Sequence, residues 1–227
     1  MASLAYSTPL DSRNKVAIID TGIDLGNEEL RPYLCRDIQA KDFTHFQEDP
    51  QDNHGHGTHL AGLITKQINP IKSCILSIKY YEVGGAGFDN LTNLVSSIQF
   101  AIKNNVKIVN ISSGGYEPSA SEKMAIKQGL QQGIIFVMAA GNGGSNLETD
   151  PYYPAAYFKH KNVHVVGSLD KKGRPLPTSN TGALVTDWAL GLSVESYCLN
   201  STKICTMSGT SQATAIITGK IAKELEK

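Results

Sequence analysis

The stretch "KVAIIDTG", residues 15–22, sets the fold class that we expect for this chain. An apolar run leads without interruption to Asp20, and the Thr–Gly pair that follows closes the run as a turn does. A strand without polar alternation is buried on both faces, which is typical of a parallel sheet covered by helices. Residues 15–20 are therefore predicted to form a buried strand with Asp20 at its carboxyl end.

Segments of the same kind alternate with helical segments along the rest of the chain. Strands are predicted over residues 74–83, 106–115, 134–144 and 162–170. Helices are predicted over residues 59–67, 90–105, 119–133 and 209–227, the third with Ser119 or Ser121 as its N-cap and Gly133 just past its end. Strands separated by helices of this length pair through right-handed crossovers. The expected fold is thus a three-layer α/β domain, a mostly parallel β-sheet with helices on both faces.

One domain is expected, preceded by a short extension. Residues 1–14 are assigned to an N-terminal extension and residues 15–227 to a single domain. Residues 171–182 are the most loop-like stretch, but strands are expected on both sides of it, so it is not a linker between domains. The first residues lack a basic segment followed by an apolar core, so no signal peptide is expected. Whether a signal or pro-segment has been removed is left open.

The composition excludes some classes of partner. The chain has 227 residues, of which 41% are hydrophobic and 19% charged, an ordinary globular mixture with enough apolar material for a sizeable core. The formal net charge is zero, so we expect no bulk attraction to nucleic acid or to an anionic membrane. No apolar run approaches the ~20 residues that a membrane span needs.

The four cysteines leave two alternatives open. No CxxC pair is present, which argues against a zinc ribbon or a thioredoxin-like redox site. Cys198 and Cys205 flank "LNSTKI" and could bridge a hairpin, whereas the alternative is four buried thiols.

Three residues with complementary chemistry fall at the ends of the predicted elements. In a parallel sheet, ligands bind beyond the carboxyl ends of the strands. Asp20 ends the first strand, His56 opens a helix, and Ser211 opens the last helix. Serine is a weak nucleophile until an imidazole takes its proton, and that imidazole needs a carboxylate to orient it. The order Asp, His, Ser and the "GTSQA" setting of Ser211 both differ from an α/β-hydrolase.

The histidine-rich stretch "DNHGHGTHLAG", residues 52–62, raises a metal site as the rival hypothesis. Metallohydrolases with an H-x-H-x-x-H pattern usually carry an aspartate between the second and third histidines, where this chain has Gly57 and Thr58. No second cluster of His, Asp or Cys is evident in the sequence. We therefore expect His56 to be a base rather than a ligand, and His59 to pack or hydrogen-bond beneath the sheet.

Four motifs carry a resemblance to a known family. The segments "IIDTGID", "HGTHLAG", "AAGN" and "MSGTSQATA", around Asp20, His56, Asn142 and Ser211, resemble the motif blocks of the subtilisin-like serine peptidases, or subtilases. They occur in order and span nearly the whole chain. "ISSGG" at 111–115 and "YPAA" at 153–156 fall where that family has substrate-binding segments. The resemblance implies a subtilisin-like fold and an uninterrupted peptidase domain.

The resemblance also implies a role for each matching residue. Ser211 would be the nucleophile, His56 the general base and acid, and Asp20 the orienting carboxylate. Asn142 would donate its side-chain amide to the oxyanion, beside the backbone N–H of Ser211. The implied substrate-binding residues are Ser112, Ser113, Gly114, Gly85, Ala139, Ala140, Gly141 and Tyr152. They would hold the substrate, a peptide or protein, as an added extended strand.

The sequence departs from the family pattern at several positions. The segment between the predicted helix and strand at 63–81 is short, so the loop that binds calcium in the family is predicted to be deleted. Glu29 stands where the family often has a calcium-binding aspartate. No metal and no cofactor are expected. Tyr152 lies where small residues commonly floor the S1 pocket, which predicts a preference for small or medium P1 side chains. Tyr153–Pro154 falls where the family has a cis peptide bond.

The sequence thus predicts a serine endopeptidase that acts through an acyl-enzyme on Ser211. Two alternatives stay open. One is a peptide macrocyclase or transpeptidase of the same fold, although the stretch between Asp20 and His56 leaves little room for the insertion that such enzymes carry. The other is a non-catalytic peptide-binding module, which would need none of Asp20, His56, Asn142 and Ser211.

A separate or removed prodomain is a further expected partner. The family suggests secretion, and the missing signal suggests the opposite.

Overall fold

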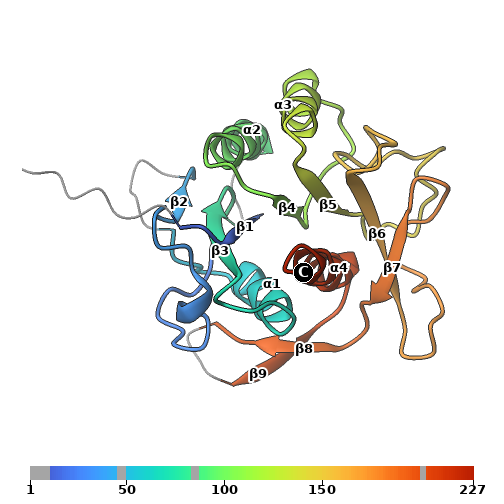
Figure 1. The fold of residues 1–227 in the computed structure, drawn as a ribbon. Helices are drawn as coiled ribbons and strands as arrows, with labels where there is room; N and C mark the ends of the chain where they lie inside the picture. Colours follow the sequence, from blue (N-terminus) through green and yellow to red (C-terminus); the bar gives the residue numbers. More distant parts are fainter. Residues whose placement is uncertain (1–10, 45–49, 83–86, 200–202) are drawn as a thin grey trace, which may run out of the picture.

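A computed structural model describes residues 11–44, 50–82, 87–199 and 203–227, and its centre is one parallel sheet (Figure 1). Seven strands pair in the order β2-β3-β1-β4-β5-β6-β7, and every adjacent pair is parallel. Its strands are β1 Asn14–Asp20, β2 Lys41–Asp42, β3 Ser73–Lys79, β4 Ile108–Ile111, β5 Ile135–Ala139, β6 Val163–Leu169 and β7 Asp187–Leu190. A separate antiparallel hairpin consists of β8 Val194–Tyr197 and β9 Ile204–Met207. The predicted fold class is confirmed.

Helices cover both faces of the sheet. They are α1 His56–Thr65, α2 Gly87–Lys103, α3 Ala120–Gln131 and α4 Thr210–Glu224, with a 3-10 turn, η1, at Arg31–Tyr33. Figure 1 shows α2 and α3 on one face, and α1 and α4 on the other. None of the described helices is long and apolar enough to span a membrane.

The first strand shows why the sheet is buried on both sides. Val16 and Ile18 belong to the core beneath α1 and α4, whereas Ala17 and Ile19 belong to the core beneath α2 and α3. All four are at most 1% exposed. The uninterrupted apolar run predicts this arrangement, because successive side chains of a strand point to opposite faces.

The order of the strands places the site. From β1 the chain passes to the edge strand β2 and then through α1 on one face to β3. It returns from β3 to β4 through α2 on the other face. β3 and β4 both pair with β1, on its two sides. The direction of winding therefore reverses next to β1, and the carboxyl ends of β1 and β4 flank the crevice where α/β sheets bind ligands.

The described strands are shorter than the sequence predicts. β3 ends at Lys79, β4 at Ile111 and β5 at Ala139, although the segments predicted as strands extend further. The residues that follow Ile111 and Ala139 leave the ladder and form the rim of the site. The boundary of the N-terminal extension after residue 14 stays a prediction.

Both alternatives for the cysteines are wrong. A disulfide joins Cys35 to Cys74 at the start of β3, with 39 residues of sequence separation, while Cys198 and Cys205 are free and half-buried. The expected hairpin does form, but Cys205 lies opposite Ser196, and the N–H of Cys198 donates to Lys203. The two thiols are thus diagonal neighbours rather than a directly opposed pair.

Two local predictions about α3 and a peptide bond are confirmed. Ser119 is the N-cap of α3 and its hydroxyl accepts the N–H of Glu122, while Gly133 just past the end has a φ of 80°. The Tyr153–Pro154 peptide bond is cis.

Candidate active site

Asp20 and His56 are in direct contact at the carboxyl end of β1. Nδ1 of His56 lies 2.7 Å from Oδ1 of Asp20, whose side chain is 0% exposed. The N–H of Thr21 donates to the same Oδ1 at 2.9 Å, while Oδ2 of Asp20 is buried and has no hydrogen-bond partner among the described residues. Burial lowers the pKa of His56, but the charge of Asp20 and its hydrogen bond outweigh burial, so the net pKa of His56 is raised. The pair is arranged to hold a proton on the imidazole.

Two threonines and an aspartate position His56. The Thr21 hydroxyl accepts the N–H of Gly57 at 3.0 Å, which ties the end of β1 to the start of α1. Asp52 accepts the N–H groups of His54 and Gly55 through Oδ1, and the N–H and hydroxyl of Thr58 through Oδ2, at 2.6–2.9 Å. Asp52 therefore accepts N–H groups at the start of α1. The N-cap residue, Gly55, has no side chain that could accept them. Sequence reasoning overlooked Asp52, although an acidic residue ahead of a helix is a known capping signal.

Ser211 lies on the same rim, in the first turn of α4. The helix begins at Thr210, packs against α1 and has Gly209 as its N-cap. The Ser211 hydroxyl donates to the carbonyl of Ser112 at 2.9 Å, and it makes no hydrogen bond to His56 in this conformation. The structure therefore brings Asp20 and His56 together and sets Ser211 against the end of β4.

Asn142 is held so that its amide group stays available. Its Oδ1 accepts the N–H of Thr210 at 2.9 Å and the Thr210 hydroxyl at 3.1 Å. Its Nδ2 makes no hydrogen bond to any described residue, and the residue is exposed. An amide oriented through its oxygen presents its N–H donors to a ligand.

Asn180, a further residue that sequence reasoning overlooked, orders the loop that carries Asn142. Its Oδ1 accepts the N–H groups of Gly143 and Ser145 at 3.0 Å, and its Nδ2 donates to the carbonyl of Ala140 at 2.8 Å. Asn180 is fully buried. No sequence signal singles it out, because it lies 38 residues beyond Asn142 in the stretch expected to be a loop.

The ring of Tyr152 lies between two backbone segments of the rim. A Cβ atom on Gly114 would lie 2.9 Å from Cε1 of Tyr152, and one on Gly141 would lie 2.9 Å from Cδ1. The two glycines follow β4 and β5 in the chain, so the ring fills the slot between the ends of these strands. Ala139 and Ala140 are buried behind it.

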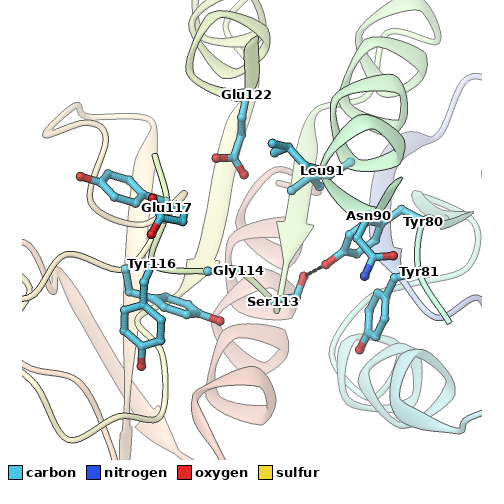
Figure 2. Close-up of a pocket in the computed structure, with 13 residues that line it drawn as sticks. Tyr80, Tyr81, Asn90, Leu91, Ser113, Gly114, Tyr116, Glu117 and Glu122 are labelled. Atoms are coloured by element: carbon cyan, nitrogen blue, oxygen red, sulfur yellow. Dashed lines mark hydrogen bonds between the residues drawn. The ribbon is translucent and has the colours of Figure 1, made fainter. Parts of the chain in front are cut away.

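A cavity of about 630 Å³ adjoins this slot. Ser113, Gly114 and Gly115 form one wall, and the hydroxyl of Tyr80 donates to that of Ser113 (Figure 2). The remaining lining residues come from the segment after β3, from α2, from the connection between β4 and α3, from the first turn of α3 and from the segment around Tyr152: Tyr81, Asn90, Leu91, Leu94, Tyr116, Glu117, Glu122, Tyr152 and Tyr153. Ser112 is buried beside Ser211, whereas Gly85 lies outside the described residues.

His59, another histidine of the stretch 52–62, lies in the interior of the protein. His59 is 0% exposed and its Nε2 lies 3.1 Å from the carbonyl of Val194, beneath the hairpin rather than the sheet. Burial lowers the pKa of His59 to about 4, so its ring is neutral near pH 7. Within the described ranges, no group of three or more His, Cys, Asp or Glu side chains is placed to hold a metal ion.

Comparison with known proteins gives one consistent result. The family model described as "Subtilase family" matches residues 11–227. Subtilisin DY of Bacillus licheniformis is 31% identical over 221 residues, which are 94% of this chain and 77% of that protein. Thermitase of Thermoactinomyces vulgaris is 30% identical over 226 residues, 96% of this chain and 77% of the relative. A solved cold adapted subtilisin-like serine proteinase superposes with a TM-score of 0.79 at 26% identity, covering 97% of this chain and 78% of the other. A solved lanthipeptide protease, 22% identical with a TM-score of 0.77 over 94% of this chain and 73% of its own, shares the fold.

Proposed function

Because the chain belongs to the subtilase family and is a subtilisin-type serine endopeptidase acting on peptide or protein substrates, we propose that it cleaves them through an acyl-enzyme on Ser211. His56 acts as general base and then as general acid, and Asp20 orients the imidazole. The observation that carries this assignment is the 2.7 Å contact between Nδ1 of His56 and Oδ1 of the buried Asp20.

The contact fixes which nitrogen of His56 is available for chemistry. Asp20 occupies Nδ1, so the proton from Ser211 goes to Nε2. For attack, the Ser211 hydroxyl turns from the carbonyl of Ser112 towards Nε2, and catalytic hydrogen bonds often form only once substrate is bound. Oγ then bonds to the substrate carbonyl carbon, and His56 returns the proton to the leaving amine. Water attacks the resulting ester with His56 again as base, which releases the acid and restores Ser211.

Asn142 and the start of α4 supply the electrostatic stabilisation. The Nδ2 group of Asn142 and the backbone N–H of Ser211 donate to the oxyanion of the tetrahedral intermediate. The Thr210 contacts support this role, because they bind Oδ1 and leave Nδ2 to face the substrate. Donors fixed in advance need no reorganisation when the charge develops, which is why such groups contribute strongly to catalysis.

Tyr152 limits the side chain that can enter next to the scissile bond. An extended substrate pairs with the segment Ser112–Gly114, and its P1 side chain would enter between the ends of β4 and β5. The ring of Tyr152 occupies that slot against Gly114 and Gly141. We therefore assign the enzyme a preference for small or medium P1 side chains.

Catalysis in this proposal uses side chains and backbone groups of the chain, with no cofactor. Proton transfer belongs to His56, and stabilisation of the developing charge belongs to Asn142 and the Ser211 N–H.

The experiment that tests the function follows the mass of the products of a defined peptide. The wild type should yield two fragments whose summed mass exceeds that of the peptide by one water, and Ser211→Ala should yield none. A cyclic or spliced product from the wild type would identify a ligase of the same fold. A wild-type protein that binds the peptide but leaves it intact would identify a binding module.

A further inference from the structure

The cavity beside Ser113, Gly114 and Gly115 lies next to the nucleophile but is not used in the mechanism above. Ser112 accepts the hydrogen bond of Ser211, and the cavity wall begins one residue further along the chain. An extended residue spans about 3.3 Å, so the wall lies within a few substrate residues of the scissile bond. A peptide that reaches Ser211 along this segment therefore passes the mouth of the cavity.

Glu122 places a buried carboxylate in this cavity. It stands in the first turn of α3, its residue is 3% exposed, and its side chain projects into the space between Leu91 and Glu117 (Figure 2). Glu122 forms no ion pair with any described residue. A buried carboxylate without a cation is costly, so its position requires an explanation.

The usual structural explanation for Glu122 fails. Ser119 and Glu122 have the spacing of a capping box, in which the glutamate side chain reaches back to the N–H of the N-cap residue. Here the N–H of Ser119 donates instead to the hydroxyl of Tyr157 at 2.6 Å. Tyr157 thus takes over the capping contact. The carboxylate of Glu122 faces the cavity, where a hydrogen bond with the Tyr157 hydroxyl stabilises it in part but supplies no positive charge.

The lining of the cavity is complementary to a long cationic side chain. The described lining contains two carboxylates, Glu117 at the exposed mouth and Glu122 within, and no Lys, Arg or His. Leu91 and Leu94 offer an apolar wall for an aliphatic stem, and the faces of Tyr80 and Tyr81 offer contacts to a cation. Burial raises the pKa of both tyrosine hydroxyls, so these groups stay neutral.

The charge state of Glu122 is sensitive to such a ligand. Burial raises the pKa of Glu122, and a hydrogen bond with Tyr157 opposes this effect without cancelling it. Burial therefore disfavours the charged carboxylate, and a cation bound in the cavity would favour it.

We propose that this cavity is a substrate subsite for a lysine or arginine side chain outside the P1 position, and that Glu122 is the residue that determines this specificity. The inference rests on the proposed function, because the cavity serves a substrate only if cleavage occurs at Ser211.

The test compares lysine with norleucine, which has the same aliphatic stem without the charge, at each non-P1 position of a small-P1 fluorogenic peptide. At one position the wild type should cleave the lysine peptide with a kcat/KM at least about tenfold higher, the size expected for one charge-assisted hydrogen bond. Glu122→Gln should bring that ratio to within about twofold of one, while kcat/KM for the norleucine peptide stays within about threefold of the wild-type value. Glu117→Gln, which removes the same charge at the mouth, is the matched control and should keep most of the preference.

Equal cleavage of the two peptides at every position by an active wild type would overturn the inference and leave the proposed function intact. A lysine preference that persists in Glu122→Gln would also overturn it. Absence of any Ser211-dependent cleavage would instead refute the proposed function, and the subsite would fall with it. Thermal unfolding of Glu122→Gln, together with its norleucine activity, separates a loss of specificity from a loss of folding.

Discussion

Oδ1 of Asp20 lies 2.7 Å from Nδ1 of His56, and the carboxylate is completely buried beneath the rim of the sheet. β1 delivers the aspartate and the first residue of α1 delivers the histidine, 36 positions later in the chain. The contact joins two elements that the sequence separates by a long loop. The charge of a buried carboxylate is poorly screened, so this relationship controls both the tautomer and the pKa of His56.

Asp20→Asn should lower kcat by about 10⁴, because an asparagine at this position supports the wrong imidazole tautomer. The variant should also shift the pH dependence. Burial lowers the pKa of His56, but the charge and hydrogen bond of Asp20, with a smaller effect from the charge of Asp52, more than offset burial, so the wild-type pKa is above its usual value of 6.5. The base must be neutral, so wild-type kcat/KM should rise with pH through a midpoint above 6.5, and the variant's midpoint should lie lower.

Asp150→Asn, at an exposed position, is the control and should leave both kcat and the pH midpoint unchanged. An unaltered pH profile in Asp20→Asn would show that another group titrates.

Asn142→Ala should lower kcat by about 10²–10³ with a small change in KM, the usual effect of removing one oxyanion donor. The matched variant is Thr210→Val, which removes the hydroxyl contact to Oδ1 but keeps the backbone contact. We expect it to retain most of the activity. Steady-state kinetics on one peptide measure both. A loss in Asn142→Ala that appears only in KM would indicate a role in ground-state binding instead.

Tyr152→Gly should open the slot between Gly114 and Gly141. The wild type should cleave peptides with alanine at P1 in preference to phenylalanine. In the variant, the ratio of kcat/KM for phenylalanine over alanine should rise by at least about tenfold, since filling an apolar pocket has effects of that size. Tyr152→Phe keeps the ring and should keep the wild-type preference. A wild type that strongly prefers phenylalanine or arginine at P1 would contradict the position we assign to the ring.

The disulfide between Cys35 and Cys74 should be a major source of stability. Closing a loop with a sequence separation of 39 restricts the unfolded chain by about 4 kcal/mol in the chain-entropy description. Urea unfolding of Cys35→Ser/Cys74→Ser should show a loss of roughly 2–4 kcal/mol, whereas Cys198→Ser/Cys205→Ser should show little change.

Treatment with EDTA tests whether the stability of the fold depends on a bound metal ion. The helix α1 ends at Thr65 and β3 begins at Ser73, so the connection that binds calcium in the family is short here. EDTA should therefore leave the unfolding midpoint of the wild type unchanged. A midpoint lowered by EDTA and restored by calcium would show that the chain holds a structural calcium ion.

The central strands and the elements that carry Asp20, His56 and Ser211 could be predicted from the sequence. β1, β4 and β5 are buried segments rich in apolar residues, and the polar residues at or shortly after their ends, Asp20, Ser112 and Asn142, mark the rim. The ends were less predictable, because the residues that follow Ile111 and Ala139 leave the ladder to form the site, although the predicted strands include them. β8 was not predicted as a strand, because its four residues are too few for the alternation of buried and exposed side chains to stand out in the sequence.

The remaining features depend on contacts between distant parts of the chain. The Cys35–Cys74 bond exists because the segment before β2 lies along β3, which no spacing of cysteines reveals. Glu122 has the spacing from Ser119 of an ordinary capping residue. Its carboxylate faces the cavity because the hydroxyl of Tyr157, from a distant part of the chain, accepts the N–H of Ser119 instead. Asn180 acts in the same way, because its hydrogen bonds go to backbone groups 37 and 35 residues away in the chain. Asp52 differs, since its contacts are with residues just after it and the capping signal lies in the sequence.

The most direct test of the assignment of Ser211 is labelling with a fluorophosphonate probe, followed by intact-mass analysis. The wild type should take up one probe per chain, while Ser211→Ala and His56→Ala should take up none. Ser208→Ala, at an exposed serine three residues earlier, should label like the wild type. A folded wild-type protein that stays unlabelled, or that labels equally after Ser211→Ala, would contradict the account.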